Sequence, residues 1–171
     1  MYCAQIDLAH LLLCEPAKND NGTNTSEGIK AITLATSVSA SLTIINLSDA
    51  RIEVECSKYI AECISVSALL TSIYLDRNNI GSEGAEHIAK GISVSASLTD
   101  IDLSYNKLGN TGAKYIAEGI SFSTSLTSID LSGNFLGVEG GKHIAKGIAV
   151  SASLTKVLAF VGNYILDSLI S

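Results

Sequence analysis

The sequence predicts an α/β fold in which strand–helix units stack into a curved solenoid. The first observation behind this prediction is a leucine that recurs with a constant step of 28 residues. The second is that apolar residues follow each leucine at alternate positions, which is typical of a strand, and the third is that apolar residues at helical spacing come next. The recurring leucines are Leu42, Leu70, Leu98, Leu126 and Leu154.

Composition limits the class of protein before any motif is considered. The chain has 171 residues, of which 47% are apolar and 16% charged, so it resembles one folded domain and not a disordered tail. Its net charge of −6 argues against a nucleic-acid or anionic-membrane partner. No stretch approaches the roughly 18 apolar residues that a membrane span requires. Since no basic residue precedes the short apolar stretch near the start, we expect no signal peptide and a cytoplasmic location.

The first half of each unit reads Leu-x-x-Ile-x-Leu-x-x-Asn and predicts a short strand followed by a turn. The apolar pairs after the leading leucine are Ile45/Leu47, Ile73/Leu75, Ile101/Leu103 and Ile129/Leu131. The asparagine recurs as Asn78, Asn106 and Asn134. Its amide can satisfy backbone groups that the turn leaves unpaired. Ala50 takes this position in the first unit, so we expect a looser turn there.

The second half of each unit predicts a helix with one apolar face. Ala85, Ile88, Ala89 and Ile92 fall at positions i, i+3, i+4 and i+7. The same spacing recurs in Ser57/Ile60/Ala61/Ile64, Ala113/Ile116/Ala117/Ile120 and Gly141/Ile144/Ala145/Ile148.

Two sets of glycines recur with the same period and predict different roles. The glycines that follow the turn suit a backbone with positive φ, whereas those inside the helices suit close helix packing. The first set is Gly81, Gly109 and Gly137, and the second is Gly91, Gly119 and Gly147.

The assembly of such units follows from their geometry. A single unit cannot bury its own apolar face, so neighbouring units must stack. Identical right-handed crossovers place the strands in one parallel sheet. Strands lie about 4.8 Å apart, whereas helices need about 10 Å. We therefore expect an arc with the parallel sheet on the concave face and the helices on the convex face.

These motifs resemble the leucine-rich repeat family, and its ribonuclease-inhibitor-like subclass in particular. The resemblance runs from Leu42 to Ser153 and includes the helices of Gly84–Ile92 and Gly112–Ile120. It implies a leucine-rich repeat solenoid, shaped as a horseshoe arc, that forms a single domain over residues 1–171. Within it we expect an irregular N-terminal cap (1–24), repeats (25–153), and a degenerate repeat with a C-terminal cap (154–171). The family's usual role implies a non-catalytic protein–protein interaction module.

Side chains that alternate with the buried ones should line the concave sheet, and there the sequence places an acidic surface with tyrosines. Tyrosine suits interface anchoring because it joins rigid apolar area to a polar tip. We predict a binding patch for a basic protein segment on this sheet and its adjacent loops. An alternative is that these residues merely fill exposed strand positions. The patch comprises Tyr74, Asp76, Arg77, Asp100, Asp102, Tyr105 and Asp130.

The sequence offers no constellation for catalysis, a metal or a cofactor. Asp102 and Asp130 should lie about 5 Å apart on adjacent strands, where we expect mildly raised pKa values and find no third ligand. His87 and His143 should lie about 20 Å apart on the helices, too far to share a metal. The four cysteines form no C-x-x-C pair, so each is expected to be a small buried apolar residue. We therefore expect no enzyme and no cofactor.

Other functions remain open at this point. Similar repeats occur in GTPase-activating proteins and in ribonuclease inhibitor, so the chain could regulate an enzyme, with Arg77 as thin support. It could also be the repeat fragment of a larger NOD-like sensor. The apolar tail, residues 157–170, is expected to cap the last repeat in a monomer, with an end-to-end dimer as the alternative.

Overall fold

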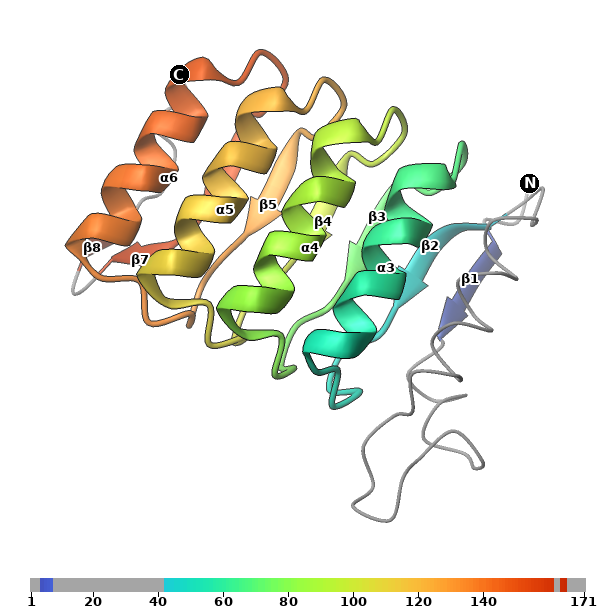
Figure 1. The fold of residues 1–171 in the computed structure, drawn as a ribbon. Coiled ribbons are helices and arrows are strands. Elements are labelled where there is room, and N and C mark those ends of the chain that lie inside the picture. Colours follow the sequence, from blue (N-terminus) through green and yellow to red (C-terminus); the bar gives the residue numbers. More distant parts are fainter. Residues whose placement is uncertain (1–3, 8–41, 162–163, 166–171) are drawn as a thin grey trace.

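Six strands form one parallel sheet in chain order (Figure 1). The parallel direction and the chain order confirm the prediction from the repeat, which did not include the first strand. The structure, a computed structural model, describes the backbone of residues 4–7, 42–161 and 164–165, and the side chains of residues 42–159. Strands that are neighbours in this sheet are consecutive along the chain, and from β2 to β6 each connection between them contains a helix. The strands are β1 (Ala4–Asp7), β2 (Leu42–Asn46), β3 (Ser72–Tyr74), β4 (Asp100–Asp102), β5 (Ser128–Asp130) and β6 (Lys156–Leu158).

Four helices pack side by side along one face of this sheet (Figure 1). Consecutive helices contact one another, so that α4 and α5 have a helix on both sides, and each helix carries its apolar face inward. This arrangement confirms the predicted α/β solenoid of strand–helix units. The helices are α3 (Val54–Val66), α4 (Gly81–Val94), α5 (Gly109–Phe122) and α6 (Val138–Val150). In the part of the chain that the structure describes, no helix is long and apolar enough to cross a membrane.

The recurring leucines occupy equivalent interior positions. Leu70, Leu98 and Leu126 are at most 1% exposed, and Leu42 and Leu154 are each 4% exposed. They belong to one continuous core cluster together with the strand isoleucines and the inward faces of the helices. Neighbouring units therefore share one core, which a single unit could not form alone.

Buried asparagines tie each turn to the preceding unit. The Asn106 side chain is fully buried, and its Nδ2 donates to the carbonyl oxygens of Leu75 at 2.8 Å and Leu103 at 3.1 Å. Its Oδ1 accepts from the backbone N–H of Ile80 at 3.4 Å. Because Leu75 and Ile80 belong to the preceding unit, one amide joins two repeats. The same contacts recur at Asn78 and Asn134.

The first turn lacks this asparagine but keeps part of the arrangement. Ala50 is fully buried at the equivalent position. The carbonyl oxygen of Leu47, in the same turn as Ala50, accepts a hydrogen bond from Asn78 Nδ2 of the following unit at 2.8 Å. The expected looseness of this turn stays a prediction.

Serine and threonine side chains add a second set of ties at the other end of the strands. Thr99 Oγ1 donates to the carbonyl oxygen of Thr71 at 3.1 Å, and Thr127 Oγ1 donates to that of Thr99 at 2.9 Å. Ser97 Oγ reaches the Ser67 carbonyl of the preceding unit at 2.8 Å. The serine-rich return segments therefore join neighbouring repeats as well as reverse the chain.

Glycines inside the helices allow the helices to approach closely, as predicted. A Cβ atom at Gly119 would lie 2.7 Å from the carbonyl oxygen of Ala89 on the preceding helix. Gly91 and Gly147 meet the backbone of α3 and α5 in the same way, at 2.8 and 2.6 Å. Because the neighbouring atoms are backbone, they cannot move aside without separating the helices.

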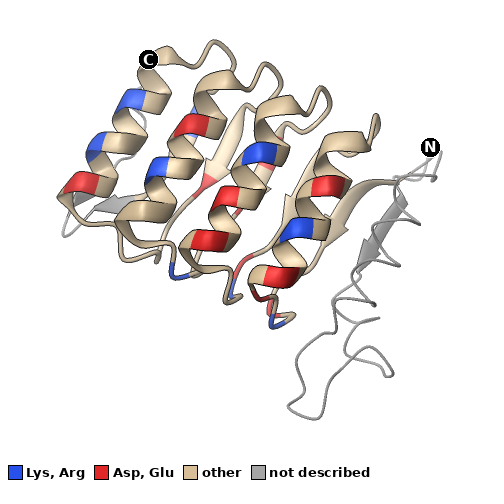
Figure 2. Ribbon diagram, in the orientation of Figure 1, with Lys and Arg blue, Asp and Glu red and all other residues tan. Residues whose placement is uncertain are grey.

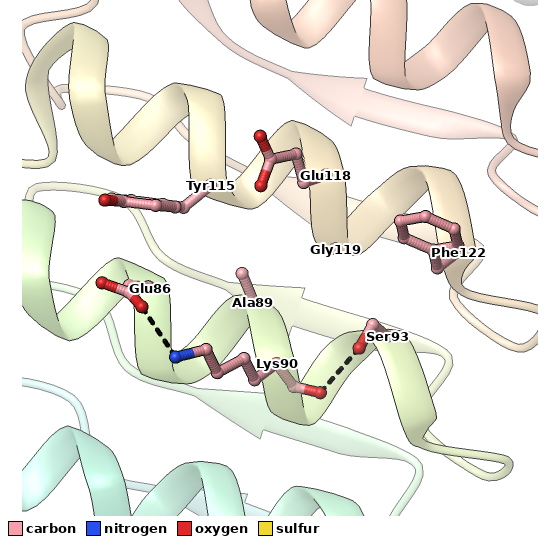
Figure 3. A pocket seen from close by; sticks show the side chains of 8 residues that line it. All are labelled: Glu86, Ala89, Lys90, Ser93, Tyr115, Glu118, Gly119 and Phe122. Atoms are coloured by element: carbon pink, nitrogen blue, oxygen red, sulfur yellow. Dashed lines mark hydrogen bonds and ion pairs between the residues drawn. The ribbon is translucent and has the colours of Figure 1, made fainter.

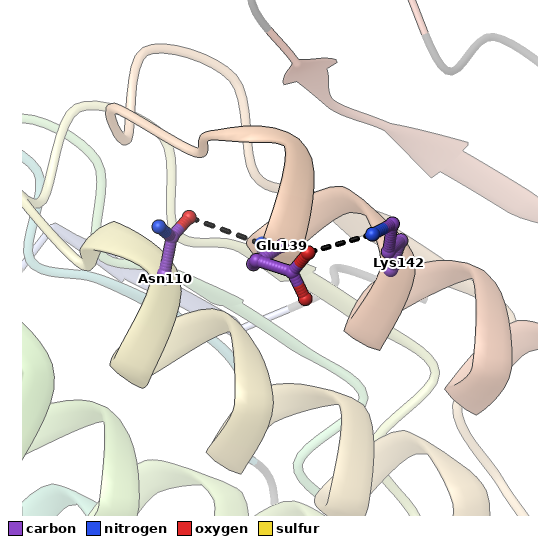
Figure 4. Close-up of polar contacts among 4 residues, drawn as sticks. Asn110, Glu139 and Lys142 are labelled. Carbon is purple, nitrogen blue, oxygen red and sulfur yellow. Dashed lines mark hydrogen bonds and ion pairs between the residues drawn. The ribbon is translucent and has the colours of Figure 1, made fainter.

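One glycine prediction is wrong. Gly81 and Gly109 have the expected positive φ, at 66° and 62°, but Gly137 has φ −82° and an extended backbone. Its N–H donates to Oδ1 of Asn110 on the preceding helix at 2.9 Å, and the Gly140 N–H donates to the same oxygen at 3.0 Å (Figure 4). The side chain of Asn110 thus caps α6 and favours the extended start.

The apolar face predicted for the last helix is only partly buried. Ala145 is exposed and Ile148 is half-buried, whereas the equivalent Ala89 and Ala117 are buried. In α4 and α5 this side receives the next helix, but no helix among the described residues covers it on α6.

Both ends depart from the repeat. Strand β1 pairs in parallel with β2, with Ile6 opposite Ile45, so part of the expected irregular N-terminal cap joins the sheet. After β6, strands β7 (Phe160–Val161) and β8 (Tyr164–Ile165) form an antiparallel pair. The helix-like pattern at residues 26–39 and the Gly162-Asn163 pair lie outside the described residues.

Candidate partner-binding surface

The register of the sheet brings the predicted concave residues together. Tyr74, Asp102 and Asp130 face one another on β3, β4 and β5. Asp100 lies in the adjacent row, opposite Ser72 and Ser128. All are partly exposed, and the isoleucine between the two rows of each strand is buried. We use the term "acidic face" for Asp76, Asp100, Asp102 and Asp130.

Two of these carboxylates also stabilise the turns after their strands. Asp102 Oδ1 accepts the backbone N–H of Ser104 at 2.8 Å, and Asp130 Oδ1 accepts that of Ser132 at 2.8 Å. A short side chain that bonds its own backbone two residues on is an Asx turn. These hydrogen bonds therefore fix the orientation of each aspartate side chain at the end of its strand.

One carboxyl group of the acidic face, that of Asp102, has a shifted pKa. Burial raises the pKa of the Asp102 carboxyl above its usual value, and hydrogen bonds from Ser104 oppose this effect. The charges of Asp130 and Asp76 raise this pKa further. The direction of this shift agrees with the sequence-based expectation for Asp102, and burial contributes more to it than the repulsion by Asp130 and Asp76.

No cation among the described residues neutralises the acidic face through an ion pair. Two ion pairs, Glu86–Lys90 at 2.7 Å and Glu139–Lys142 at 2.6 Å, lie on the helices (Figures 3 and 4). The helices carry charges of both signs (Figure 2). Asp76 instead accepts a short hydrogen bond from the Ser48 hydroxyl of the preceding unit.

A stack of three residues borders the acidic face on the loops after β3, β4 and β5. The Arg77 guanidinium carbon lies 5.9 Å from the centre of the Tyr105 ring, within the range of a cation–π contact. On the next loop, a Cβ at Gly133 would lie 2.5 Å from the Tyr105 ring, so glycine leaves space for the ring. Tyr105 remains 57% exposed although its ring is held between these neighbours. The Tyr105 ring therefore offers an exposed aromatic surface whose orientation is set by its neighbours.

Two loop residues differ from their counterparts in the other units in ways that the repeat pattern did not reveal. Gly133 replaces the bulkier Arg77 and Tyr105 of the preceding loops and makes room for the tyrosine ring. Phe135 is 81% exposed and has φ 55°, a left-handed conformation that is unusual for a bulky residue. Comparison of equivalent positions between units would have identified both, because each departs from the residue types of the other copies.

The remaining titratable residues form no further site among the residues that the structure describes. These residues contain no group of three or more His, Cys, Asp or Glu side chains able to hold a metal ion. His87 and His143 lie on α4 and α6, with α5 between them. Cys56 and Cys63 are buried, as expected of small apolar residues, and Cys3 and Cys14 lie outside the described residues.

Comparisons with known proteins agree with this architecture. The family described as Leucine Rich repeat matches residues 66–89, 94–117 and 122–145. Among curated proteins, none matches this chain. The repeats are therefore leucine-rich repeats, and their helical convex side is compatible with the ribonuclease-inhibitor-like subclass. Three successive strand–helix units of this chain thus match the leucine-rich repeat family.

Two solved structures share the fold at low sequence identity. The first, actin-binding site 2 of leiomodin-1, has 16% identity and a TM-score of 0.62, and the match covers 85% of this chain and 80% of that one. The second, a tropomodulin C-terminal domain from Caenorhabditis elegans, has 18% identity and a TM-score of 0.61, with 74% and 76% covered. At these identities the likeness supports the fold alone.

Proposed function

We propose that this chain is a non-catalytic protein-interaction module that binds a basic protein segment across its concave sheet and adjacent loops. The observation that carries the proposal is the acidic face, whose carboxylates repel one another and, among the described residues, form no ion pair. A basic partner would reduce this repulsion, and it would not have to replace a lysine or arginine of the described residues that is already ion-paired with these carboxylates. The contact residues are Tyr74, Asp76, Arg77, Asp100, Asp102, Tyr105 and Asp130.

The charge pattern of the convex face supports the same choice of surface. Opposite charges alternate on neighbouring helices there, with Glu62, Lys90, Glu118 and Lys146 at equivalent positions. Such a pattern offers a charged partner no single sign of potential. On the concave side, the charged residues of β4 and β5 are all aspartates, and Asp76 follows β3, which favours a partner of the opposite sign.

Tyr105 supplies the apolar part of the proposed contact. Its ring is already fixed between Arg77 and Gly133, so binding would immobilise little additional side-chain freedom. Exposed tyrosines of this kind are common anchors in protein interfaces. We therefore expect the partner segment to place an apolar or aromatic residue next to its basic residues.

A peptide-binding experiment tests the proposal. The purified chain is titrated into fluorescently labelled Arg- and Lys-rich peptides that contain one aromatic residue, and into acidic peptides of the same length. We expect fluorescence anisotropy to show binding of the basic set, and the triple variant Tyr74→Ala, Asp102→Ala, Tyr105→Ala to abolish it. Equal binding of both sets, or full retention by the triple variant, would contradict the proposal.

The matched control removes acidic charge from the convex face. Glu62→Gln together with Glu118→Gln changes two exposed helix carboxylates, and we expect affinity for the basic peptides to persist. Actin is a suitable first protein to test with the same variants, because one structural neighbour is an actin-binding site of leiomodin-1.

Two alternatives have less support. A GTPase-activating role would need an available arginine, whereas the guanidinium of Arg77 lies over Tyr105. A GTP-hydrolysis assay with a panel of small GTPases checks this, and no stimulation is expected. Membership of a larger NOD-like sensor predicts a longer transcript. We expect a monomer in solution, and a dimer by light scattering that Ile165→Lys dissolves would overturn that expectation.

A further inference from the structure

Helix α6 is the last helix of the row, and the side that it turns away from α5 is exposed (Figure 1). Ala145 and Ala149 on this side are exposed, whereas Ala117, the counterpart of Ala145 on α5, is buried against α6. We name this side of α6 the end face. It consists of Lys142, Ala145, Lys146 and Ala149, and the equivalent residues of α4 line the groove between α4 and α5.

The molecule contains three examples of what packs against such a face. A Cβ atom at Gly119 would lie 2.7 Å from the carbonyl oxygen of Ala89, so α5 can approach α4 this closely only with glycine at that position (Figure 3). The same contact of glycine with alanine recurs at Gly91 and Gly147. Ala145 is the next alanine in this series. A helix that packs on α6 in the same way therefore needs a glycine opposite Ala145.

A charged residue accompanies each of these contacts, and its sign alternates from helix to helix. Glu62, Lys90, Glu118 and Lys146 occupy equivalent positions on α3 to α6. Lys90 and Glu118 line the groove between α4 and α5, and Glu118 and Lys146 line the groove between α5 and α6. Both grooves therefore bring a lysine together with a glutamate. On the end face, the same complementarity calls for a carboxylate opposite Lys146.

The last unit also carries an excess of positive charge. Residues 138–159 contain three lysines and a single glutamate, whereas each preceding unit has at least as many acidic as basic residues. The glutamate, Glu139, already pairs with Lys142 at 2.6 Å. Lys146 is exposed and forms no ion pair within the part of the chain that the structure describes. The end face therefore favours a negatively charged partner.

We propose that the end face docks a helix of another protein that presents a glycine to Ala145 and a carboxylate to Lys146. A glutamate directly before the glycine meets both requirements, as Glu118 and Gly119 do where α5 packs on α4. Such a helix would cover the exposed alanines of α6. The end face shares no residue with the acidic face, so this proposal does not depend on the function proposed above.

Three designed peptides test this proposal. Each is a helix held by a side-chain cross-link. The first carries the pattern Tyr-x-x-Glu-Gly found at residues 115–119 of α5, the second has lysine in place of the glutamate, and the third has leucine in place of the glycine. Each peptide is titrated into the isotope-labelled chain, and amide signals are followed by nuclear magnetic resonance.

We expect the first peptide to shift the amide signals of α6 and to leave those of α4 unchanged. The second peptide should bind about tenfold more weakly because it places a lysine against Lys146. The third should bind about tenfold more weakly because its leucine holds the two helices apart. Equal affinity for all three peptides, or shifts confined to other helices, would overturn the proposal.

An exchange of charge identifies the contact. Lys146→Glu should weaken binding of the first peptide about tenfold and strengthen binding of the second by a similar factor. Lys90→Glu makes the same change at the equivalent position of α4, whose side already holds α5, and should leave both affinities unchanged. Both lysines are exposed, and thermal melts followed by circular dichroism check that each variant folds. Equal effects of the two variants would show that overall charge attracts the peptide, and would contradict the proposal.

Two other occupants of the end face would also overturn the proposal. If sedimentation shows self-association that Lys146→Glu removes, the end face joins copies of this chain. If the first peptide binds only after residues 166–171 are removed, the chain itself occupies the end face. The proposal requires that the chain sediments as one species and that the full chain binds the first peptide.

Discussion

Single amide side chains at the turns connect neighbouring repeats. Asn106 is fully buried and satisfies carbonyl groups of two units at once. Asn106→Ala should lower the free energy of unfolding by about 3 kcal/mol, because buried backbone groups lose their partners. Chemical denaturation measures this change. Asn79→Ala alters an exposed asparagine and serves as the control, for which a change of less than about 0.5 kcal/mol is expected. Equal losses for both variants would contradict the role given to Asn106.

The Asp102 carboxyl makes a pH-dependent prediction. Its pKa is raised in the folded state, so its protonated form favours folding, and this contribution is present at low pH and lost as the pH rises through the folded-state pKa. Asn at this position can still accept the Ser104 N–H while carrying no charge. Asp102→Asn should therefore raise stability at neutral pH.

The gain from Asp102→Asn should diminish as the pH falls toward the ordinary pKa of an aspartate. Denaturation of both proteins across this range measures the difference. A gain that is independent of pH, or a loss at neutral pH, would show that desolvation and the charges of Asp130 and Asp76 do not control this carboxyl.

At the scale of the helix, close packing outweighs intrinsic helix propensity. Alanine favours a helix over glycine by about 1 kcal/mol. At Gly119, however, the added methyl group would lie 2.7 Å from the carbonyl oxygen of Ala89. Gly119→Ala should therefore destabilise the protein, by about 1–3 kcal/mol. Thermal or chemical denaturation gives the value.

A substitution on the same helix isolates the cause. Thr111→Ala introduces alanine at an exposed position of α5. It should be neutral or slightly stabilising, because it improves helix propensity without crowding a neighbour. If Gly119→Ala were stabilising as well, the contact with α4 would be looser than the structure indicates.

For the whole molecule, stability should vary along the stack. Each unit is stabilised by its neighbours, and α6 lacks a helix on one side among the described residues, which leaves Ala145 exposed. Hydrogen exchange should therefore be faster for the backbone amides of α6 than for those of α4 and α5. Equal protection in all three helices would indicate that the far side of α6 is covered in solution.

The repeat allowed most of the fold to be predicted from sequence. The 28-residue step identified the units, their interior leucines and the parallel direction of the strands, because one packing solution must satisfy every copy. The exceptions are local. Asn110 caps α6, and Gly133 leaves space for the Tyr105 ring. Both features depend on residues that differ between units, so the residues that all units share do not predict them.

The candidate site was less accessible to sequence reasoning than the fold. Strand alternation placed Tyr74, Asp102 and Asp130 on one surface, which the register confirms. It did not indicate that Asp102 and Asp130 bond their own turns, or that Arg77 lies over Tyr105.

The threonine and asparagine ties have a consequence for how such a molecule can change its length. Thr99 bonds the threonine 28 residues before it, and Asn106 bonds the carbonyl 31 residues before it. Excision or duplication of one complete period would restore each of these partners at the new junction. The number of units can thus change by whole periods. Gene duplication could lengthen the solenoid while the hydrogen bonds between neighbouring units stay the same.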